Sequence, residues 1–264
     1  MPPIITLTTD FGLADHYAGV MKAVILGICP NARIVDITHE IRPFDIAGAA
    51  FTIAQARPYF PPKTVHVVVV DPGVGTARRP ILVEAAGQFF LGPDNGVFAL
   101  ALSREKHRVR AISNAKYFLK PVSQTFHGRD VFAPVAAHIA NGRSLARIGK
   151  LITDPLISSS PEPVGDIKRG WTGSVLHVDH FGNVITNLPA SDFPRPFVMT
   201  LGAKKVTRLA GDYQSFGPGE LFAIAGSSGY LEISARESSA AKILGVKRGD
   251  SAKLSYRRSR SQSR

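Results

Sequence analysis

The chain has 264 residues, of which 44% are hydrophobic and 20% charged, and its net charge is +12. That length is enough for one large domain or for two small domains with their own hydrophobic cores. The sequence has no apolar run long enough to span a bilayer, and the residues after Met1 lack the basic and apolar regions of a signal peptide.

The first half of the chain alternates between strand and helix patterns. Three stretches rich in β-branched and apolar residues are predicted strands: 4–9, 33–38 and 64–70. Three stretches with helical patterns are predicted helices: 14–28, 45–56 and 129–142. Asp45 is a plausible N-cap of the second helix, and Gly142 follows the end of the third. This alternation predicts an α/β domain with a mainly parallel sheet and helices on both faces.

The composition changes within 157–170, where the chain is rich in serine, proline and glycine. Beyond it, short strand patterns are separated by glycine, proline or aspartate, which favours a small all-β barrel. We therefore predict four parts: an N-terminal α/β domain over 1–160, a linker over 161–170, a C-terminal β-barrel domain over 171–257 and a basic tail over 258–264.

Two features bear on the compartment and the partners of the protein. The single cysteine, Cys29, can form no internal disulfide, which fits a reducing compartment and predicts a cytoplasmic protein. The stretch from Lys253 to the C-terminus holds five basic residues and no acid. We interpret it as a solvated tail, and we expect neither a nucleic acid nor a membrane as partner.

Acidic residues cluster where the predicted strands end. Asp10 and Asp15 follow the first strand, Asp36 lies in the second, Asp71 follows the third, and Asp94 lies within GPDNG. Ligands of open α/β sheets bind beyond the carboxyl ends of the strands. Aspartates at such places also form turns, and for Asp36 and Asp94 that interpretation stays open.

Two nucleotide-binding motifs are absent from the sequence. The stretch GVGTAR has Arg78 where the dinucleotide fingerprint requires its third glycine, and no P-loop pattern occurs. These absences argue against a nicotinamide enzyme and against a nucleoside-triphosphate enzyme.

Seven motifs together resemble one family. In chain order they are TTDFGLADHYAG, DITHEI, VDPGVGTARR, GPDNG, TFHGRDVFAPVAA, DHFGNVITN and GYLEI. The chain resembles the S-adenosyl-L-methionine (SAM) hydroxide adenosyltransferases, relatives of the fluorinase and chlorinase, from about Ile4 to Tyr256. The resemblance implies an α/β domain followed by a β-barrel, and a homotrimer with each active site between the N-domain of one subunit and the C-domain of the next. It implies hydrolysis of SAM to adenosine and L-methionine, for which we expect neither a metal nor an organic cofactor.

The resemblance also implies roles for particular residues. Asp71, Arg78 and His127 correspond to the set that holds and activates water, and which of them is the formal base stays open. Arg79 is the alternative to Arg78. A surface ion pair for Arg78 and a hydrogen-bonded turn for His127 are the structural alternatives.

Six further residues correspond to substrate contacts. By resemblance, Asp10 accepts both ribose hydroxyls, Phe181 stacks on adenine and Asn183 hydrogen-bonds its edge. Asp15, Asp179 and Ser227 correspond to residues around the methionine amino and carboxylate groups. The stretch FGN is also good turn chemistry, so a β-turn with a core phenylalanine is the alternative.

The sequence departs from the halogenase branch at several places. Ile185 replaces a tryptophan near the adenine, and Arg236 replaces an asparagine that many family members have. The long loop insertion of the fluorinase is missing. Asp71 and Gly128 replace the tyrosine and serine of its halide pocket, and an acid at that place would repel a halide. Two alternative functions remain: a halide-dependent 5′-halo-5′-deoxyadenosine synthase and a non-catalytic adenosine- or SAM-binding protein.

Overall fold

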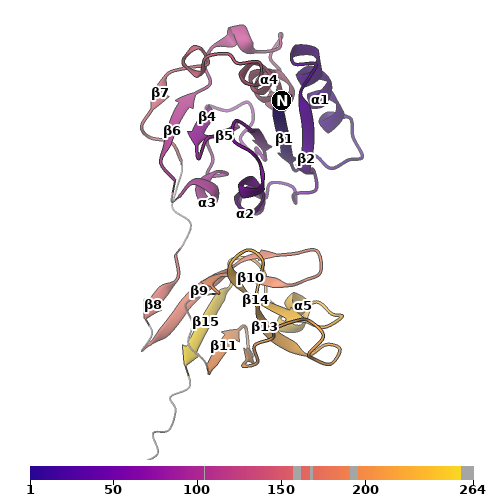
Figure 1. The fold of residues 1–264 in the computed structure, drawn as a ribbon, viewed down its shortest axis with the longest axis vertical. Coiled ribbons are helices and arrows are strands. Elements are labelled where there is room, and N and C mark those ends of the chain that lie inside the picture. Colours follow the sequence, from indigo (N-terminus) through magenta and orange to yellow (C-terminus); the bar gives the residue numbers. More distant parts are fainter. Residues whose placement is uncertain (104, 157–161, 167–168, 191–195, 257–264) are drawn as a thin grey trace, which may run out of the picture. The chain divides into compact units, whose positions relative to one another are not determined.

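The computed structural model describes residues 1–103, 105–156, 162–166, 169–190 and 196–256 (Figure 1). The chain divides into two compact units, Met1–Ser160 and Pro161–Arg264. Each unit has its own hydrophobic core, and each is described by itself below.

The described part of the first unit holds a seven-stranded mixed sheet. Its strands are β1 (Ile4–Thr9), β2 (Arg33–Thr38), β3 (Val65–Val69), β4 (Pro80–Ala85), β5 (Gln88–Pro93), β6 (His107–Ala111) and β7 (Leu151–Ile152), in the spatial order β2-β1-β3-β5-β4-β6-β7. The four strands from β2 to β5 in this order pair in parallel, and the other pairs are antiparallel. β1 and β3, the strands that Asp10 and Asp71 follow, therefore lie in the parallel part of the sheet.

A hairpin that the sequence analysis did not predict joins β4 and β5. Its two turn residues, Ala86 and Gly87, both have positive φ angles, 50° and 73°. Positive φ at both central residues is the requirement of a type I′ turn, whose twist matches that of the two flanking strands. The hairpin replaces a helical crossover with a tight reversal, which adds the antiparallel half of the sheet.

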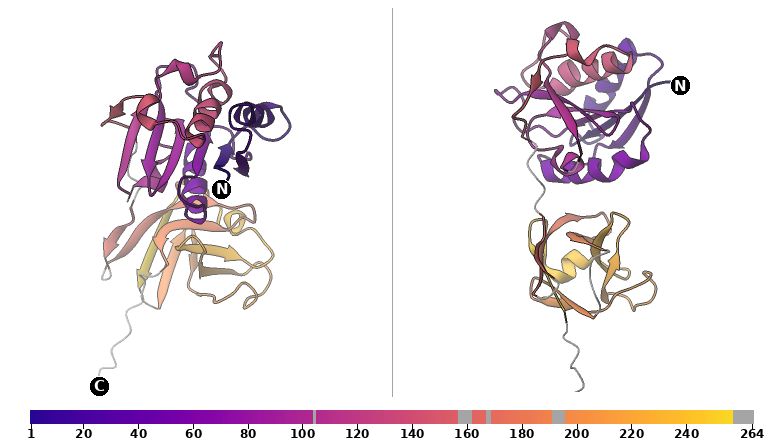
Figure 2. Two further views of the ribbon diagram at one scale, coloured as in Figure 1. Left: turned by 45° about the horizontal axis from the view of Figure 1, so that its top comes forward. Right: turned by 60° about the vertical axis from the view of Figure 1, so that its left-hand side comes forward.

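Helices cover both faces of this sheet, as the right-hand view of Figure 2 shows. The α-helices are α1 (Tyr17–Ile28), α2 (Ile46–Ala56), α3 (Ala99–Leu102) and α4 (Ala133–Ala140). The side chains of β3 alternate between two cores: Val67 packs with α1 and α4, whereas Val68 packs with the core that includes α2 and α3. The continuous valine run is thus buried on both faces, as predicted.

Two of the predicted helices differ from the observed ones. The first begins at Tyr17 instead of residue 14, since 10–16 forms a loop at the end of β1. The third begins as a π-helical turn, Gly128–Phe132, and continues as α4 to Ala140, with Gly142 at a φ of 79° beyond its end. Asp45 caps α2 as predicted, since its Oδ1 accepts a hydrogen bond from Gly48 N at 2.7 Å.

The described part of the second unit is a nearly closed antiparallel β-barrel. Its elements are β8 (Val164–Asp166), β9 (Gly170–Val178), β10 (Val184–Pro189), β11 (Phe197–Leu201), β12 (Lys204–Val206), β13 (Leu221–Ala225), β14 (Tyr230–Ala235), β15 (Ser251–Tyr256) and the short helix α5 (Ala240–Leu244). The path runs β12-β11-β15-β9-β10-β14-β13, and β8 pairs with β9. Residues 164–166, expected in a linker, therefore belong to the barrel sheet. The expected basic tail, 258–264, lies outside the described residues.

Membrane insertion as a helix finds no support in the described residues. None of their helices combines the length with the apolar composition that crossing a bilayer requires.

A buried histidine stacks against the core of the first unit. His66 on β3 has 0% exposure, and its Nδ1 lies 2.8 Å from Oγ1 of Thr6. Its ring stacks on Phe90 with a centroid distance of 4.9 Å. Burial lowers the pKa of His66 from 6.5 to about 4, because the charged imidazolium is disfavoured away from water.

This histidine predicts a loss of stability in mild acid. An unfolded His66 takes up a proton near pH 6.5, whereas the folded one does so only near pH 4, so the free energy of unfolding should fall between these values. The loss approaches about 3 kcal/mol at the acid end of this window. Urea unfolding at pH 7, 6, 5 and 4.5 measures it. A His66→Phe variant should lose that part of the pH dependence, and an unchanged slope in the variant would contradict the assignment.

Candidate active site

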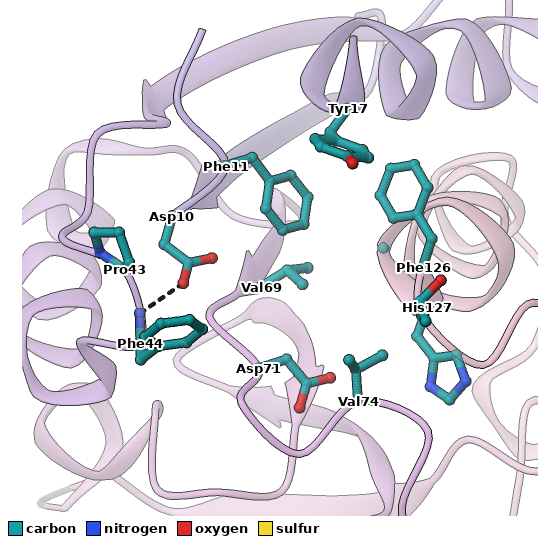
Figure 3. Close-up of a pocket in the computed structure, with 12 residues that line it drawn as sticks. Asp10, Phe11, Tyr17, Pro43, Phe44, Val69, Asp71, Val74, Phe126 and His127 are labelled. Atoms are coloured by element: carbon teal, nitrogen blue, oxygen red, sulfur yellow. Dashed lines mark hydrogen bonds between the residues drawn. The ribbon is translucent and has the colours of Figure 1, made fainter. Parts of the chain in front are cut away.

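A pocket of about 290 Å³ opens at the carboxyl ends of β1 and β3 (Figure 3). Thr9 and Val69 are register partners, so Asp10 and Asp71 leave the same edge of the sheet from neighbouring strands. The pocket is lined by Asp10, Phe11, Tyr17, Pro43, Phe44, Val69, Asp71, Val74, Thr125, Phe126, His127 and Gly128. This is the edge at which α/β sheets bind ligands.

Three of the expected site residues form one polar network. Arg78 Nε donates to Asp71 Oδ1 at 2.9 Å, and Arg78 Nη2 donates to Asp71 Oδ2. Arg78 Nη2 also lies 2.9 Å from Nδ1 of His127. The Arg78 and Asp71 side chains are only 10% and 5% exposed, so their pair is shielded from solvent. A bidentate guanidinium–carboxylate pair of this kind fixes orientation as well as charge.

The arginine determines the protonation state of His127. A guanidinium can only donate, so Nδ1 must accept, and the neutral ring carries its proton on Nε2. Burial and the neighbouring Arg78 lower the pKa of His127 below 6.5, although Asp71 and Asp130 act in the opposite direction. His127 is therefore a neutral hydrogen-bond donor at Nε2 near pH 7.

One nitrogen of Arg78 remains free within the described part of the chain. Nη1 is buried and has no hydrogen-bond partner there, while one face of the guanidinium lies 5.5 Å from the ring centroid of Phe132. In the planar guanidinium, one N–H of Nη1 points parallel to the Nη2–H bond that reaches His127.

Arg79, the alternative to Arg78, pairs with Asp94 and Asp154 instead of with Asp71. Its Nε and Nη2 donate to Asp94 Oδ2 at 3.1 and 2.7 Å, and its Nη1 donates to Asp154 Oδ1 at 2.8 Å. Asp94 also accepts a hydrogen bond from Leu156 N. Arg79 and Asp94 thus tie loops together away from the pocket, and Asp94 has the structural role that its sequence left open.

Asp10 points into the pocket with one oxygen already engaged. Its Oδ2 accepts a hydrogen bond from Phe44 N at 2.9 Å (Figure 3). Phe44 has a φ of 66°, a region that non-glycine residues rarely adopt, and its side chain is 71% exposed. Asp15 lies exposed in the loop before α1 and does not line the pocket.

The sequence analysis missed the aromatic wall of the pocket. The rings of Phe11, Tyr17 and Phe126 pack edge to face with centroid distances of 5.1 to 5.9 Å. Two of them flank assigned residues within quoted motifs, DFGLAD and TFHGRD, so their positions were a signal that could have found them. At these spacings the rings contact one another and form a mainly apolar wall of the pocket.

The second unit presents the other expected contacts on a tight turn before β10. Asp179 holds this turn: its Oδ1 accepts from Asn183 N at 2.8 Å, and its Oδ2 accepts from Asn183 Nδ2 at 2.9 Å. The chemistry of FGN is therefore that of a turn, as one interpretation expected. Its phenylalanine is not a core residue, however, since Phe181 is 75% exposed.

The second unit also contains Ser227, Arg236 and Ile185. Ser227 is exposed in the turn after β13. Arg236 donates from Nη1 to Phe216 O at 2.9 Å, which gives it a structural contact within the unit. Ile185 is buried on β10, directly opposite Glu232 on β14.

The described residues show no cluster of three or more histidine, cysteine, aspartate or glutamate side chains arranged to hold a metal ion.

The network around His127 predicts how its pKa responds to mutation. Removing the guanidinium in Arg78→Met takes away a positive neighbour but leaves the Asp71 carboxylate, so the pKa of His127 should rise from its lowered value. NMR titration of the imidazole Cε1–H signal measures this shift. Arg79→Met serves as the control, since Arg79 contacts Asp94 and Asp154 instead. A His127 pKa that stays equally low in both variants would rule out the network.

The turn that carries Phe181 depends on glycine. Gly182 has a φ of 87°, and a Cβ placed there would lie 2.1 Å from Ser239 Oγ. Gly182→Ala should therefore lower the melting temperature more than Gly219→Ala, whose φ of 75° carries the same backbone penalty of about 1–2 kcal/mol but whose surroundings are open. Thermal unfolding of both variants makes the comparison, and equal losses would show that the contact with Ser239 is not restrictive.

Comparison with known proteins agrees with the two units. Residues 5–149 match the model of the SAM hydroxide adenosyltransferase N-terminal domain, and residues 173–253 match that of its C-terminal domain. A crystal structure of an uncharacterized conserved protein from Thermotoga maritima is 39% identical, with a TM-score of 0.87 over 95% of this chain and 100% of that one.

Several curated relatives cover nearly the whole chain. The (R)-S-adenosyl-L-methionine hydrolase of Salinispora tropica is 40% identical over 94% of this chain and 96% of its own, and that of Methanocaldococcus jannaschii is 36% identical over 96% of both. The fluorinase of Nocardia brasiliensis is 27% identical over 96% of both chains. The chain therefore belongs to the SAM hydroxide adenosyltransferase family.

Proposed function

We propose that the protein hydrolyses SAM to adenosine and L-methionine. The observation that carries the proposal is the shielded Asp71–Arg78–His127 network, which presents Asp71 and His127 to the pocket. The relatives from Salinispora tropica and Methanocaldococcus jannaschii, which are (R)-SAM hydrolases, support the same reaction.

The reaction makes a limited demand on the protein. The oxygen of water forms a bond to C5′ of the ribose, the bond from C5′ to the sulfonium sulfur breaks, and its electron pair stays on sulfur. Methionine leaves as a neutral thioether, so no acid has to protonate it. The water loses one proton. The site must hold the water in line with the breaking bond and favour its hydroxide form.

Each member of the network has a distinct part in this proposal. Arg78 holds the Asp71 carboxylate in place, and its positive charge stabilises the negative charge that develops on the water oxygen. His127 accepts from Arg78 at Nδ1, which keeps the guanidinium oriented, and it can donate from Nε2. Asp71 is the ionised acceptor at the pocket wall, and each of its oxygens retains a lone pair beyond the bonds to Arg78. In this arrangement Asp71, not His127, takes the proton of the water.

The substrate is bound at both ends. Asp10 accepts the ribose hydroxyls with its free oxygen and the second lone pair of Oδ2. Phe181 stacks on adenine, and Asn183 accepts from the adenine amino group through Oδ1, since its Nδ2 is engaged by Asp179. Asp15, Asp179 and Ser227 take the methionine amino and carboxylate groups.

A homotrimer brings these two sets of residues together in our proposal. The N-terminal unit of each subunit contributes the pocket, and the C-terminal unit of its neighbour contributes Phe181 and Asn183. The exposure of Phe44 at the pocket and of Phe181 on its turn, 71% and 75%, supports this arrangement, since large apolar side chains of this kind are typically covered by a ligand or another chain.

The halide-dependent alternative is disfavoured by charge. The Asp71 carboxylate lines the pocket, and a halide anion would have to approach it at short range. A purely binding protein would leave SAM intact, so product analysis separates this alternative from the hydrolase.

The decisive experiment traces the oxygen atom of water into the product adenosine. Incubation with the separate (R) and (S) sulfonium epimers of SAM in H₂¹⁸O should yield adenosine labelled at C5′ and unlabelled methionine, and chelators should leave the rate unchanged. Arg78→Met should cut turnover by about 10²–10⁴-fold, whereas Arg79→Met should alter mainly stability. Product analysis is repeated with added chloride. Unlabelled adenosine, or 5′-chloro-5′-deoxyadenosine as the main product, would overturn the proposal.

A further inference from the structure

The motif DITHEI, residues 36–41, has no part in the reaction proposed above, yet it lies behind the pocket. His39 within it is 3% exposed. Its Nδ1 lies 2.8 Å from Thr9 Oγ1, and its Nε2 lies 3.1 Å from Asp36 Oδ1. Lys22 of α1 donates to the other oxygen of Asp36. A chain of polar contacts therefore runs from α1 to the last residue of β1.

The donors and acceptors of this chain agree in direction. Phe11 N donates to Thr9 Oγ1 at 3.3 Å, so the hydroxyl proton of Thr9 is available to His39 Nδ1. With Nδ1 accepting, Nε2 carries a proton and faces Asp36 Oδ1 at 3.1 Å, within ion-pair distance but without the geometry of a hydrogen bond. The contacts place the His39 ring between Thr9, which it meets in a hydrogen bond, and the Asp36 carboxylate.

The main chain of the same segment holds the residues around Asp10. His39 O accepts from Gly12 N at 2.8 Å, and Thr9 O accepts from Ile41 N at 3.3 Å. Phe44 N donates to the Asp10 carboxylate itself. His39 therefore contacts the chain on both sides of Asp10, at Thr9 through its side chain and at Gly12 through its carbonyl.

The order hydroxyl–imidazole–carboxylate is also that of a nucleophilic triad, but the geometry opposes this role. Thr9 is 0% exposed and does not line the pocket, and its oxygen already accepts from Phe11 N. A substrate cannot reach it. What the contacts can do is fix the turn that aims Asp10.

We infer that His39, held between Thr9 and Asp36, is a positioning residue that orients Asp10 toward the ribose hydroxyls of the substrate. This inference rests on the proposed function in one respect, namely that Asp10 binds the ribose. It assigns the DITHEI motif to substrate affinity rather than to the chemical step.

The first test replaces the Thr9 hydroxyl with a methyl group, which changes the side-chain volume little. Thr9→Val should weaken adenosine binding about threefold to tenfold by calorimetry, and should raise KM for SAM while kcat stays within about twofold, since Asp71, Arg78 and His127 are untouched. Thr6→Val is the matched control. It breaks the equivalent threonine–histidine contact, Thr6 to His66, in the same strand and at the same 0% exposure, but away from Asp10. The control should bind adenosine like the wild type.

A second measurement separates positioning from general loss of structure. In an Asp10→Ala background, Thr9→Val should cause no further loss of adenosine affinity, because the carboxylate it orients is gone. Likewise, 2′,3′-dideoxyadenosine, which lacks the diol, should bind the Thr9→Val variant and the wild type equally. Additive losses, or an equal loss for both nucleosides, would overturn the inference.

Two histidine variants test the arms of the network separately. In His39→Asn the amide oxygen can replace Nδ1 and accept from Thr9, whereas in His39→Gln the amide nitrogen can replace Nε2 and contact Asp36. We expect Asn to retain more adenosine affinity than Gln, because the Thr9 contact is the one adjacent to Asp10. The reverse order would contradict the inference.

If Asp10→Ala itself left adenosine affinity unchanged, the proposed site would fail, whereas normal binding by Thr9→Val alone would refute only the role of His39.

Discussion

The bidentate pair between Arg78 and Asp71 is the interaction on which the candidate site depends. It neutralises a shielded carboxylate at the end of β3, and it leaves one edge of the guanidinium to face His127. Because the arginine can only donate, it sets the imidazole tautomer and keeps the ring uncharged near pH 7. Asp71, Arg78 and His127 are therefore not independent residues, since Arg78 contacts both of the others.

The fold brings these residues together through strand order. β1 and β3 are neighbours in parallel, so the residues that follow them, Asp10 and Asp71, emerge side by side. The π-helical turn before α4 then delivers His127, with α4 packed against both strands. The valines of β3 are buried on both faces of the sheet, which holds the strand that leads to Asp71 in place.

Much of this arrangement could be predicted from the sequence, and the exceptions have physical reasons. The valine run, the Asp45 cap and the barrel strands were predictable because periodicity and capping are local. The β4–β5 hairpin was missed because its turn uses Ala86 in a conformation that alanine rarely adopts. The aromatic wall was missed because ring packing depends on residues more than 100 positions apart, Phe11 and Phe126. The contact of His39 with the end of β1 was missed because Thr9 lies 30 positions earlier in the chain, and no sequence spacing encodes that contact.

Local charge, not net charge, is what suits the pocket to its proposed substrate. The chain carries a charge of +12, which by itself would favour an anionic ligand. At the pocket, however, Arg78 is paired with Asp71 and His127 is neutral, so Asp10 contributes a carboxylate that no cation offsets among the lining residues. A slightly negative, apolar-walled pocket favours a cationic sulfonium over a halide. The same charge is lost when the carbon–sulfur bond breaks, so this attraction acts on the substrate more than on its neutral thioether product.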